Sequence, residues 1–173
     1  MAASAGFESM DAWQGIDQAT PGEARRLLAR ACGSSRWVDR MMARRPFGSR
    51  DALLAAAQEE WDRLPENGWR EAFTHHPKIG DRSALRERFP ATHALSAREQ
   101  VGVDGASDAV LEALADGNRR YEERFGYIFI VCASGRTAAE MLAMLTARLE
   151  NDPTREIQIA AAEQAKITAL RLV

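Results

Sequence analysis

The chain has 173 residues, 46% of them hydrophobic and 28% charged, and its 23 basic and 25 acidic side chains leave a formal net charge of −2. These proportions are typical of a soluble globular protein of one domain, and they exclude a disordered or fibrous chain. Because there is no basic excess to neutralise phosphates, we expect no nucleic-acid partner and no binding to a membrane surface.

The sequence favours a cytoplasmic location. Only two cysteines occur, Cys32 and Cys132, which is too few for the disulfide framework of a small secreted domain. Residues 1–10 lack the basic and apolar stretches of a secretory leader, and no window approaches the roughly 20 apolar residues of a membrane span.

The spacing of apolar residues predicts an all-α fold, a single compact bundle of about eight or nine helices formed by residues 1–173. Proline and glycine punctuate the chain between stretches in which apolar residues recur at helical spacing. The clearest predicted helices run from Pro21 to Gly33, from Ser49 to Pro65, from about Asp108 to Gly126, from Thr137 to Glu150 and from Pro153 to Leu172.

Two stretches break this pattern. Residues 73–106 contain too many prolines and glycines for a long helix, so we expect an irregular loop there with short helical pieces. The apolar run 127–133 is rich in β-branched residues, yet no second strand-like run exists to pair with it. We therefore expect an isolated extended or distorted helical segment in the core.

The first candidate for chemistry is His76. Pro77 restricts the backbone of His76 to extended conformations, and Gly80 allows a sharp turn shortly after it, so the imidazole is held on a loop. Imidazole titrates near neutral pH and is the commonest general acid or base. Spacing alone leaves a capping or packing role open. We expect His75 and His93 to face solvent.

The second candidate is the stretch Ser96–Gln100. It has the form of a capping box, with Ser96 as the N-cap and Glu99 at the third helical position. The same geometry gathers a hydroxyl, free backbone N–H groups and a carboxylate at a helix end, where an anionic ligand is stabilised. The motif by itself does not decide between the two roles.

The sequence offers little support for a metal or nucleotide site. Three histidines with Asp81 and Glu99 could supply zinc ligands, but no His-Glu-x-x-His or paired Cys-x-x-Cys spacing occurs. Glycine-rich motifs for dinucleotides or nucleoside triphosphates are absent as well. We expect no metal and no cofactor.

An ordered set of motifs runs from about Ala12 to Leu172. The motifs are Arg45-Pro46-Phe47, His76-Pro77-Lys78-Ile79-Gly80, Ser96-x-x-Glu99-Gln100, Asn118-x-x-Tyr121-x-x-x-Phe125-Gly126-Tyr127-x-Phe129-Ile130, Gly135-Arg136-Thr137, Arg148-Leu149-x-Asn151-Asp152 and Lys166-Ile167-x-x-x-Arg171-Leu172. This set resembles the 2-oxo-4-hydroxy-4-carboxy-5-ureidoimidazoline (OHCU) decarboxylases of urate breakdown. The resemblance implies an all-helical, cofactor-free enzyme, usually a homodimer, that converts OHCU to S-allantoin and carbon dioxide.

The resemblance also implies the site. The catalytic histidine of the family falls on His76 and its partner carboxylate on Glu99. The positions that contact substrate fall on Pro77, Ser96, Gln100, Phe129, Ile130, Val131, Cys132, Ala133 and Arg171. One departure is Tyr127, where phenylalanine is common, and another is Ile128, where animal members often have proline. If Arg171 contacts the substrate, the last helix folds back over the His76 loop and the C-terminus is buried.

Two other functions stay open on the residues alone. One is a non-catalytic helical binding module, in which the His-Pro turn and the capping box are structural. The other is a metal-dependent hydrolase acting on a ureide of the same pathway. The sequence does not locate the dimer surface, for which Trp37, Met41 and Met42 are candidates.

Overall fold

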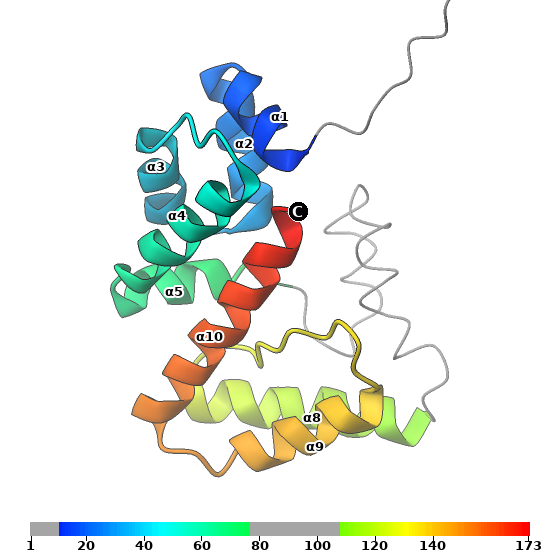
Figure 1. Ribbon diagram of the computed structural model, residues 1–173. Coiled ribbons are helices and arrows are strands. Elements are labelled where there is room, and N and C mark those ends of the chain that lie inside the picture. Colours follow the sequence, from blue (N-terminus) through cyan, green and yellow to red (C-terminus); the bar gives the residue numbers. More distant parts are fainter. Residues whose placement is uncertain (1–10, 77–107) are drawn as a thin grey trace, which may run out of the picture. The chain divides into compact units, whose positions relative to one another are not determined.

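The computed structural model describes residues 11–76 and 108–173, and within these ranges every regular element is a helix (Figure 1). The all-α prediction is confirmed. The eight helices of the described residues are α1 (Ala12–Gln18), α2 (Pro21–Ala31), α3 (Ser35–Ala43), α4 (Arg50–Asp62), α5 (Glu66–Phe73), α8 (Asp108–Phe125), α9 (Ala138–Arg148) and α10 (Pro153–Arg171).

The described residues fall into two compact units. Those of the first lie before Arg70 and from Ala165 onward, and those of the second lie between Arg70 and Gln164. Helix α10 belongs to both, because its first part packs in the second unit and its last turns in the first.

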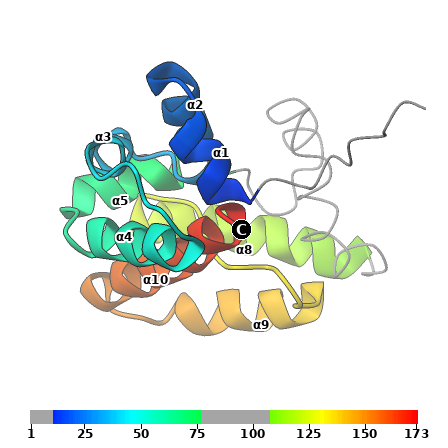
Figure 2. The same ribbon diagram turned by 45° about the horizontal axis from the view of Figure 1, so that its top comes forward.

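In the first unit, α1 packs against α2 and α4, α2 against α3, and α3 against α4 (Figure 2). The core lies between them and includes Trp37 and Met41, neither of which is exposed at all. The indole N–H of Trp37 donates to the C=O of Ala57 on α4 at 3.0 Å. The suggestion that Trp37 and Met41 form a dimer surface is therefore wrong for both side chains, and Met42 is half-buried.

The motif Arg45-Pro46-Phe47 joins the loop after α3 to the end of α1. One guanidinium nitrogen of Arg45 donates to the C=O groups of Asp17 and Ala19, at 3.0 and 2.8 Å. In return, the Asp17 carboxylate accepts the N–H groups of Phe47 and Gly48, each at 2.9 Å from Oδ2. The motif thus satisfies backbone groups that the helix end and the turn leave unpaired.

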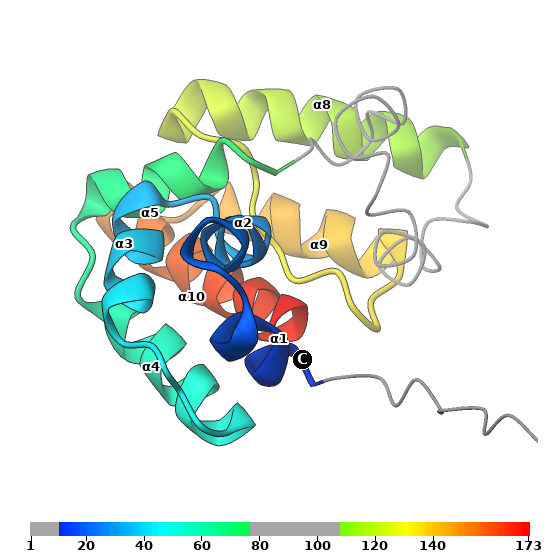
Figure 3. The ribbon, with the colours of Figure 1, turned by 90° about the horizontal axis from the view of Figure 1, so that it is seen from above.

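In the second unit, α8 and α9 contact each other and point the same way, and the chain between them runs back along their length (Figure 3). Gly117 allows the close approach: a Cβ at this position would lie 2.6 Å from Cδ2 of Leu145 on α9. Leu114 and Tyr121 on α8 and Met141 on α9 are buried beside it. The spacing of Leu114 and Tyr121 puts both on one face of α8, as an amphipathic helix requires.

The start signals read from the sequence also hold. The hydroxyls of Ser49 and Thr137 cap α4 and α9 by accepting N–H groups of the first turn, at 3.1 and 3.2 Å. Helix α2 begins at Pro21. Helices α1, α3 and α5 were not predicted individually.

The predicted irregular loop 73–106 lies largely outside the described residues: α5 ends at Phe73, a turn follows to His76, and the description resumes at Asp108. Among the helices of the two described stretches, none has the length and hydropathy needed to cross a bilayer.

Candidate active site

The predicted site residues lie on three parts of the chain. His76 ends the turn after α5 and is half-buried, and the segment 129–133 belongs to the same compact unit. Arg171 is the last residue of α10 and belongs to the first unit. Pro77, Ser96, Glu99 and Gln100 lie outside the described residues.

The turn that carries His76 is anchored by α5. The N–H of His76 donates to the C=O of Phe73 at 3.2 Å. Phe73 is buried and its ring packs on Tyr127, with centroids 5.2 Å apart. Tyr127 precedes Phe129 by two residues, so the end of α5 lies against the start of the segment 129–133.

Arg70 makes a second connection between α5 and this part of the chain. Its guanidinium lies over the Tyr127 ring, 5.0 Å from the centroid, and donates to the C=O of Phe125 at 3.5 Å. Gly126 lies between Phe125 and Tyr127 in the chain and has a φ of 77°, a left-handed conformation that ends α8 and turns the chain. His75, in contrast, is exposed, as expected, and its Nδ1 lies 3.1 Å from the C=O of Glu71.

The segment 127–133 has no regular secondary structure, as the sequence predicted. The side chains of Phe129, Ile130 and Val131 are buried, and those of Cys132 and Ala133 are half-buried. In a buried irregular segment, backbone N–H and C=O groups without hydrogen-bond partners are costly. Here side chains from three helices supply partners for several of these groups.

Each of those helices contributes one polar side chain to the segment. Oδ1 of Asn118 on α8 accepts the N–H of Phe129 at 2.9 Å. Arg148 on α9 donates from Nη1 to the C=O of Ile130 at 2.8 Å. Oε2 of Glu163 on α10 accepts the N–H of Cys132 at 2.8 Å. All three side chains are at least nine-tenths buried.

Arg148 is itself held in a buried charge cluster. It pairs with Glu156 on α10, with Nη2 and Oε1 2.6 Å apart, and its Nη2 also donates to the Tyr121 hydroxyl at 3.3 Å. The Tyr121 hydroxyl donates to Oε1 of Glu156, and the Asn151 amide donates to Oε2 at 2.6 Å. Every polar group of the cluster thus has a partner, which a buried ion pair needs.

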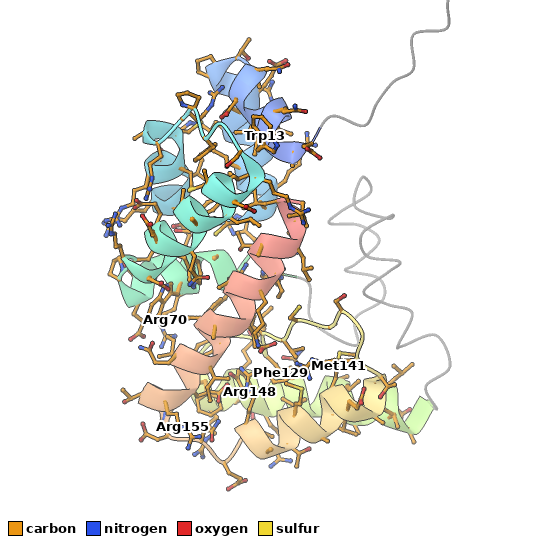
Figure 4. The ribbon with its side chains drawn as sticks, viewed as in Figure 1. Trp13, Arg70, Phe129, Met141, Arg148 and Arg155 are labelled. Carbon is orange, nitrogen blue, oxygen red and sulfur yellow. The ribbon has the colours of Figure 1, made fainter. Side chains whose placement is uncertain are left out.

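The cluster contacts the segment through an aromatic face as well. The guanidinium of Arg148 lies 4.6 Å from the centroid of Phe129, and Figure 4 shows the two side chains together between α9 and the first part of α10. Tyr121 packs edge-on against Phe129 with centroids 5.3 Å apart. Burial, followed by the hydrogen bond to Glu156, raises the pKa of Tyr121, so this phenol stays protonated at physiological pH.

Tyr127, where the sequence departs from the common phenylalanine, is also buried. Its ring packs between Phe73 and Tyr121, with centroid distances of 5.2 and 5.7 Å. Burial raises the pKa of its phenol. The additional hydroxyl therefore lies in the interior of the second unit, not on its surface.

The C-terminal prediction can be followed within the first unit. Arg171 is half-buried, Leu172 is 2% exposed and Val173 is 52% exposed, so the last turn of α10 is packed while the final residue is not. A shallow hollow on the second unit contains none of the predicted site residues; it is lined by Arg120, Glu123, Arg124, Leu149 and Glu150. In residues 11–76 and 108–173 no group of three potential ligands is arranged for a metal ion.

A family model described as OHCU decarboxylase matches residues 17–173 and so includes almost all of the described elements. The chain belongs to the OHCU decarboxylase family. The resemblance seen in the sequence motifs is confirmed.

Curated relatives in this family come from distant organisms. The uric acid degradation bifunctional protein TTL of Arabidopsis thaliana is 40% identical over 141 residues, which are 82% of this chain and 44% of that protein. The 2-oxo-4-hydroxy-4-carboxy-5-ureidoimidazoline decarboxylase of Amia calva is 34% identical over 131 residues, covering 74% of this chain and 73% of that protein. The chain thus spans less than half of the Arabidopsis protein.

Solved structures share the fold. A crystal structure of OHCU decarboxylase in the presence of (S)-allantoin is 38% identical, with a TM-score of 0.71 over 83% of this chain and 92% of that chain. A crystal structure of (S)-allantoin synthase is similar in fold, with a TM-score of 0.66 over 92% of this chain and 52% of that chain.

Three residues that matter to the segment 129–133 were given no role in the sequence analysis: Asn118, Arg148 and Glu163. Asn118 and Arg148 stand in the family motifs, and each is a polar residue among buried apolar positions of its helix, whereas Glu163 lies on a buried face of α10 that carries other polar residues as well. A polar residue at a buried position is the sequence signal for such a role, because a buried polar side chain requires a hydrogen-bond partner. The partner is a loop backbone, which the sequence does not identify.

Proposed function

We propose that this chain decarboxylates OHCU to S-allantoin and carbon dioxide in urate degradation. The observation that carries the proposal is the family match over residues 17–173. A related protein of 38% identity and similar fold was crystallised in the presence of (S)-allantoin, the product of the proposed reaction. The second unit also keeps His76 and the segment 129–133 in one compact body, tied through Phe73 and Tyr127.

The reaction needs no electron sink other than its substrate. In OHCU the carbon that carries the carboxylate also carries a hydroxyl and adjoins a C=N bond. When the C–C bond to the carboxylate breaks, its electron pair forms a C=C bond, the π pair of the C=N bond moves to the nitrogen, which takes a proton from water, and an enol is left as carbon dioxide leaves. Loss of the hydroxyl proton and addition of a proton to the carbon that bears the ureido group give allantoin. The face on which that proton adds fixes the S configuration.

The protein must therefore hold a flat ring and deliver a proton to one face. In this proposal His76 donates or shuttles that proton, since its imidazole titrates near neutral pH. Glu99 orients His76 or accepts the hydroxyl proton of the substrate. Arg171 supplies a planar set of donors for an oxo or ureido oxygen.

The remaining positions form the walls of the site. Pro77, Ser96 and Gln100 contact the substrate near His76, and the segment from Phe129 to Ala133 covers the ring. Its buried side chains exclude water, and its backbone offers N–H and C=O groups to a heterocycle rich in donors and acceptors. Exclusion of water favours decarboxylation, because the charge of the carboxylate disperses as carbon dioxide forms.

Three wider properties belong to the same proposal. The protein acts as a homodimer and is cytoplasmic, as its family resemblance and its composition suggest. The two compact units form one functional domain, since the family match runs through both of them. The substrate is a small molecule, with neither nucleic acid nor membrane as a partner.

Freshly prepared OHCU tests the function directly. The purified protein should accelerate loss of OHCU far above the spontaneous rate, and circular dichroism should show S-allantoin as the product. Activity that survives exhaustive chelation excludes the metal-dependent hydrolase. Binding without turnover would instead favour the non-catalytic module and would contradict the proposal.

A further inference from the structure

The backbone on either side of Val131 is fixed by charged side chains. The C=O of Ile130 accepts from Arg148 at 2.8 Å, and the N–H of Cys132 donates to Glu163 at 2.8 Å. Both of these side chains are at least nine-tenths buried. Two successive peptide groups are therefore held by full charges in a part of the protein that excludes water, where such hydrogen bonds are strong.

The geometry of the peptide bond turns these two contacts into a constraint on Val131. In a trans peptide the C=O of one residue and the N–H of the next point in opposite directions, and neither of these two bonds is cis. When Arg148 holds the C=O of Ile130, the N–H of Val131 must point away from Arg148. When Glu163 holds the N–H of Cys132, the C=O of Val131 must point away from Glu163.

The backbone N–H and the backbone C=O of Val131 make no hydrogen bond to any group in residues 11–76 and 108–173. The residue is only 6% exposed. A buried donor and a buried acceptor left unpaired are costly unless something else binds them. Asn118 and Arg136 extend the arrangement by holding the N–H of Phe129 and the C=O of Cys132, at 2.9 and 3.1 Å.

We propose that Glu163 is a positioning residue of the decarboxylase: by holding the N–H of Cys132, it aims the C=O of Val131 at a donor of the substrate ring. Arg148 aims the N–H of Val131 in the same way. The segment then presents a donor and an acceptor side by side, which matches the adjacent C=O and N–H of a cyclic urea. This inference rests on the proposed function, because the ring that it recognises is that of OHCU.

Glu163 is the better residue for the test, because Arg148 also belongs to the buried ion pair. Glu163→Gln keeps an oxygen that accepts the Cys132 N–H, whereas Glu163→Met keeps the length of the side chain and removes the acceptor. We expect Glu163→Gln to retain the KM of the wild type. Glu163→Met should raise KM for OHCU and lower kcat/KM by about 10-fold to 100-fold, the size expected for one hydrogen bond to a charged group.

Two controls separate positioning from general stability. Glu123→Met makes the same chemical change at an exposed site on α8 and should leave the kinetics unchanged. Amide hydrogen exchange at Cys132 should be slow in the wild type and in Glu163→Gln, and faster in Glu163→Met. The fraction of folded Glu163→Met protein, measured by circular dichroism, corrects its kcat.

Each other outcome counts against the inference. An unchanged KM in Glu163→Met, or a loss explained entirely by the unfolded fraction, would show that Glu163 is only structural. Equal losses in the Gln and Met variants would show that the charge acts on the substrate itself. A wild type without activity on OHCU would overturn the proposed function together with this inference, whereas an active wild type with an unaffected Met variant overturns the inference alone.

Discussion

Arg148 and Glu156 form an ion pair in the interior of the second unit, where their side chains are 7% and 0% exposed. The pair joins α9 to α10, and through Arg148 it also holds the C=O of Ile130. The segment that we propose to cover the substrate and the junction between two helices thus share one guanidinium.

The first prediction follows from removing one charge of this pair. Arg148→Met leaves the Glu156 carboxylate buried without its cation, which costs about 3–5 kcal/mol of unfolding free energy. Urea unfolding measures this loss. Arg155→Met changes an exposed arginine at the start of α10 and should alter stability by less than about 0.5 kcal/mol.

A double variant tests whether the charge is the cause. Arg148→Met with Glu156→Gln removes both charges but keeps an acceptor for Tyr121. Its loss should be smaller than the sum of the two single losses by at least about 1 kcal/mol. Strict additivity would mean that the two side chains do not interact, in contradiction to the structure.

The second prediction concerns the turn that Asp17 holds. Asp17→Ala removes the acceptor of the Phe47 and Gly48 N–H groups and should destabilise the protein by about 1–3 kcal/mol. Asp17→Asn keeps one oxygen and should lose less. Thermal unfolding of both variants gives the comparison, and equal losses would show that the hydrogen bonds do not hold this turn.

The third prediction contrasts two helical glycines. Gly117→Ala places a methyl group 2.6 Å from a Leu145 carbon, which is buried and has little room to move, so stability should fall by about 1–3 kcal/mol. Gly15→Ala meets no atom within 4 Å and should gain up to about 1 kcal/mol from the higher helix propensity of alanine. Chemical unfolding of both variants measures the two changes in the free energy of unfolding. Changes of the same sign in both variants would contradict this prediction.

The fourth prediction uses the phenol of Tyr127. Burial raises its pKa in the folded protein above the unfolded value of about 10, so the folded state binds the proton more tightly. The stability from this group is complete below pH ~10 and is lost as pH rises from there through the folded pKa, with a slope of up to about 1.4 kcal/mol per pH unit.

Tyr127→Phe removes this titration and keeps the ring between Phe73 and Tyr121. The variant should lie within about 1 kcal/mol of the wild type at pH 7 and lose stability less steeply between roughly pH 9.5 and 11. Urea unfolding across this range measures the difference. Parallel curves for the two proteins would argue against a buried phenol.

Much of the fold could be predicted because its signals are local. Helices α4 and α9 begin directly after Ser49 and Thr137, where the sequence predicted their starts. The lack of any strand to pair with 127–133 predicted an isolated segment, and the structure has no regular element there. Helices α1, α3 and α5 have only 7, 9 and 8 residues, too few turns for periodicity to mark them clearly.

What could not be predicted depends on contacts between distant residues. From the sequence Trp37 is a candidate for the dimer surface, yet its indole donates to a carbonyl on another helix and is fully buried. Glu60 is buried because Arg40, Arg44 and Arg63 lie within 3.5 Å of its carboxylate. No single sequence motif predicts that these side chains lie together. The site is similar: the family motifs name His76 and the segment 129–133, while the helices that hold the segment emerge only from the fold.

The fifth prediction concerns the proposed proton donor. His76→Gln removes the titrating imidazole and should lower kcat for OHCU by about 10²-fold to 10⁴-fold, the usual contribution of proton transfer by a side chain. Because His76 is half-buried at the end of a turn, the fold should survive the change. His75→Gln, which alters the exposed neighbour, should keep near wild-type activity.

The handedness of the product tests the central claim most directly, because only an enzyme that delivers the proton to one face yields a single enantiomer. Circular dichroism of allantoin formed from OHCU should show pure S product with the wild type and with His75→Gln, and slow formation of nearly racemic product with His76→Gln. Rapid formation of S-allantoin by His76→Gln would contradict the account.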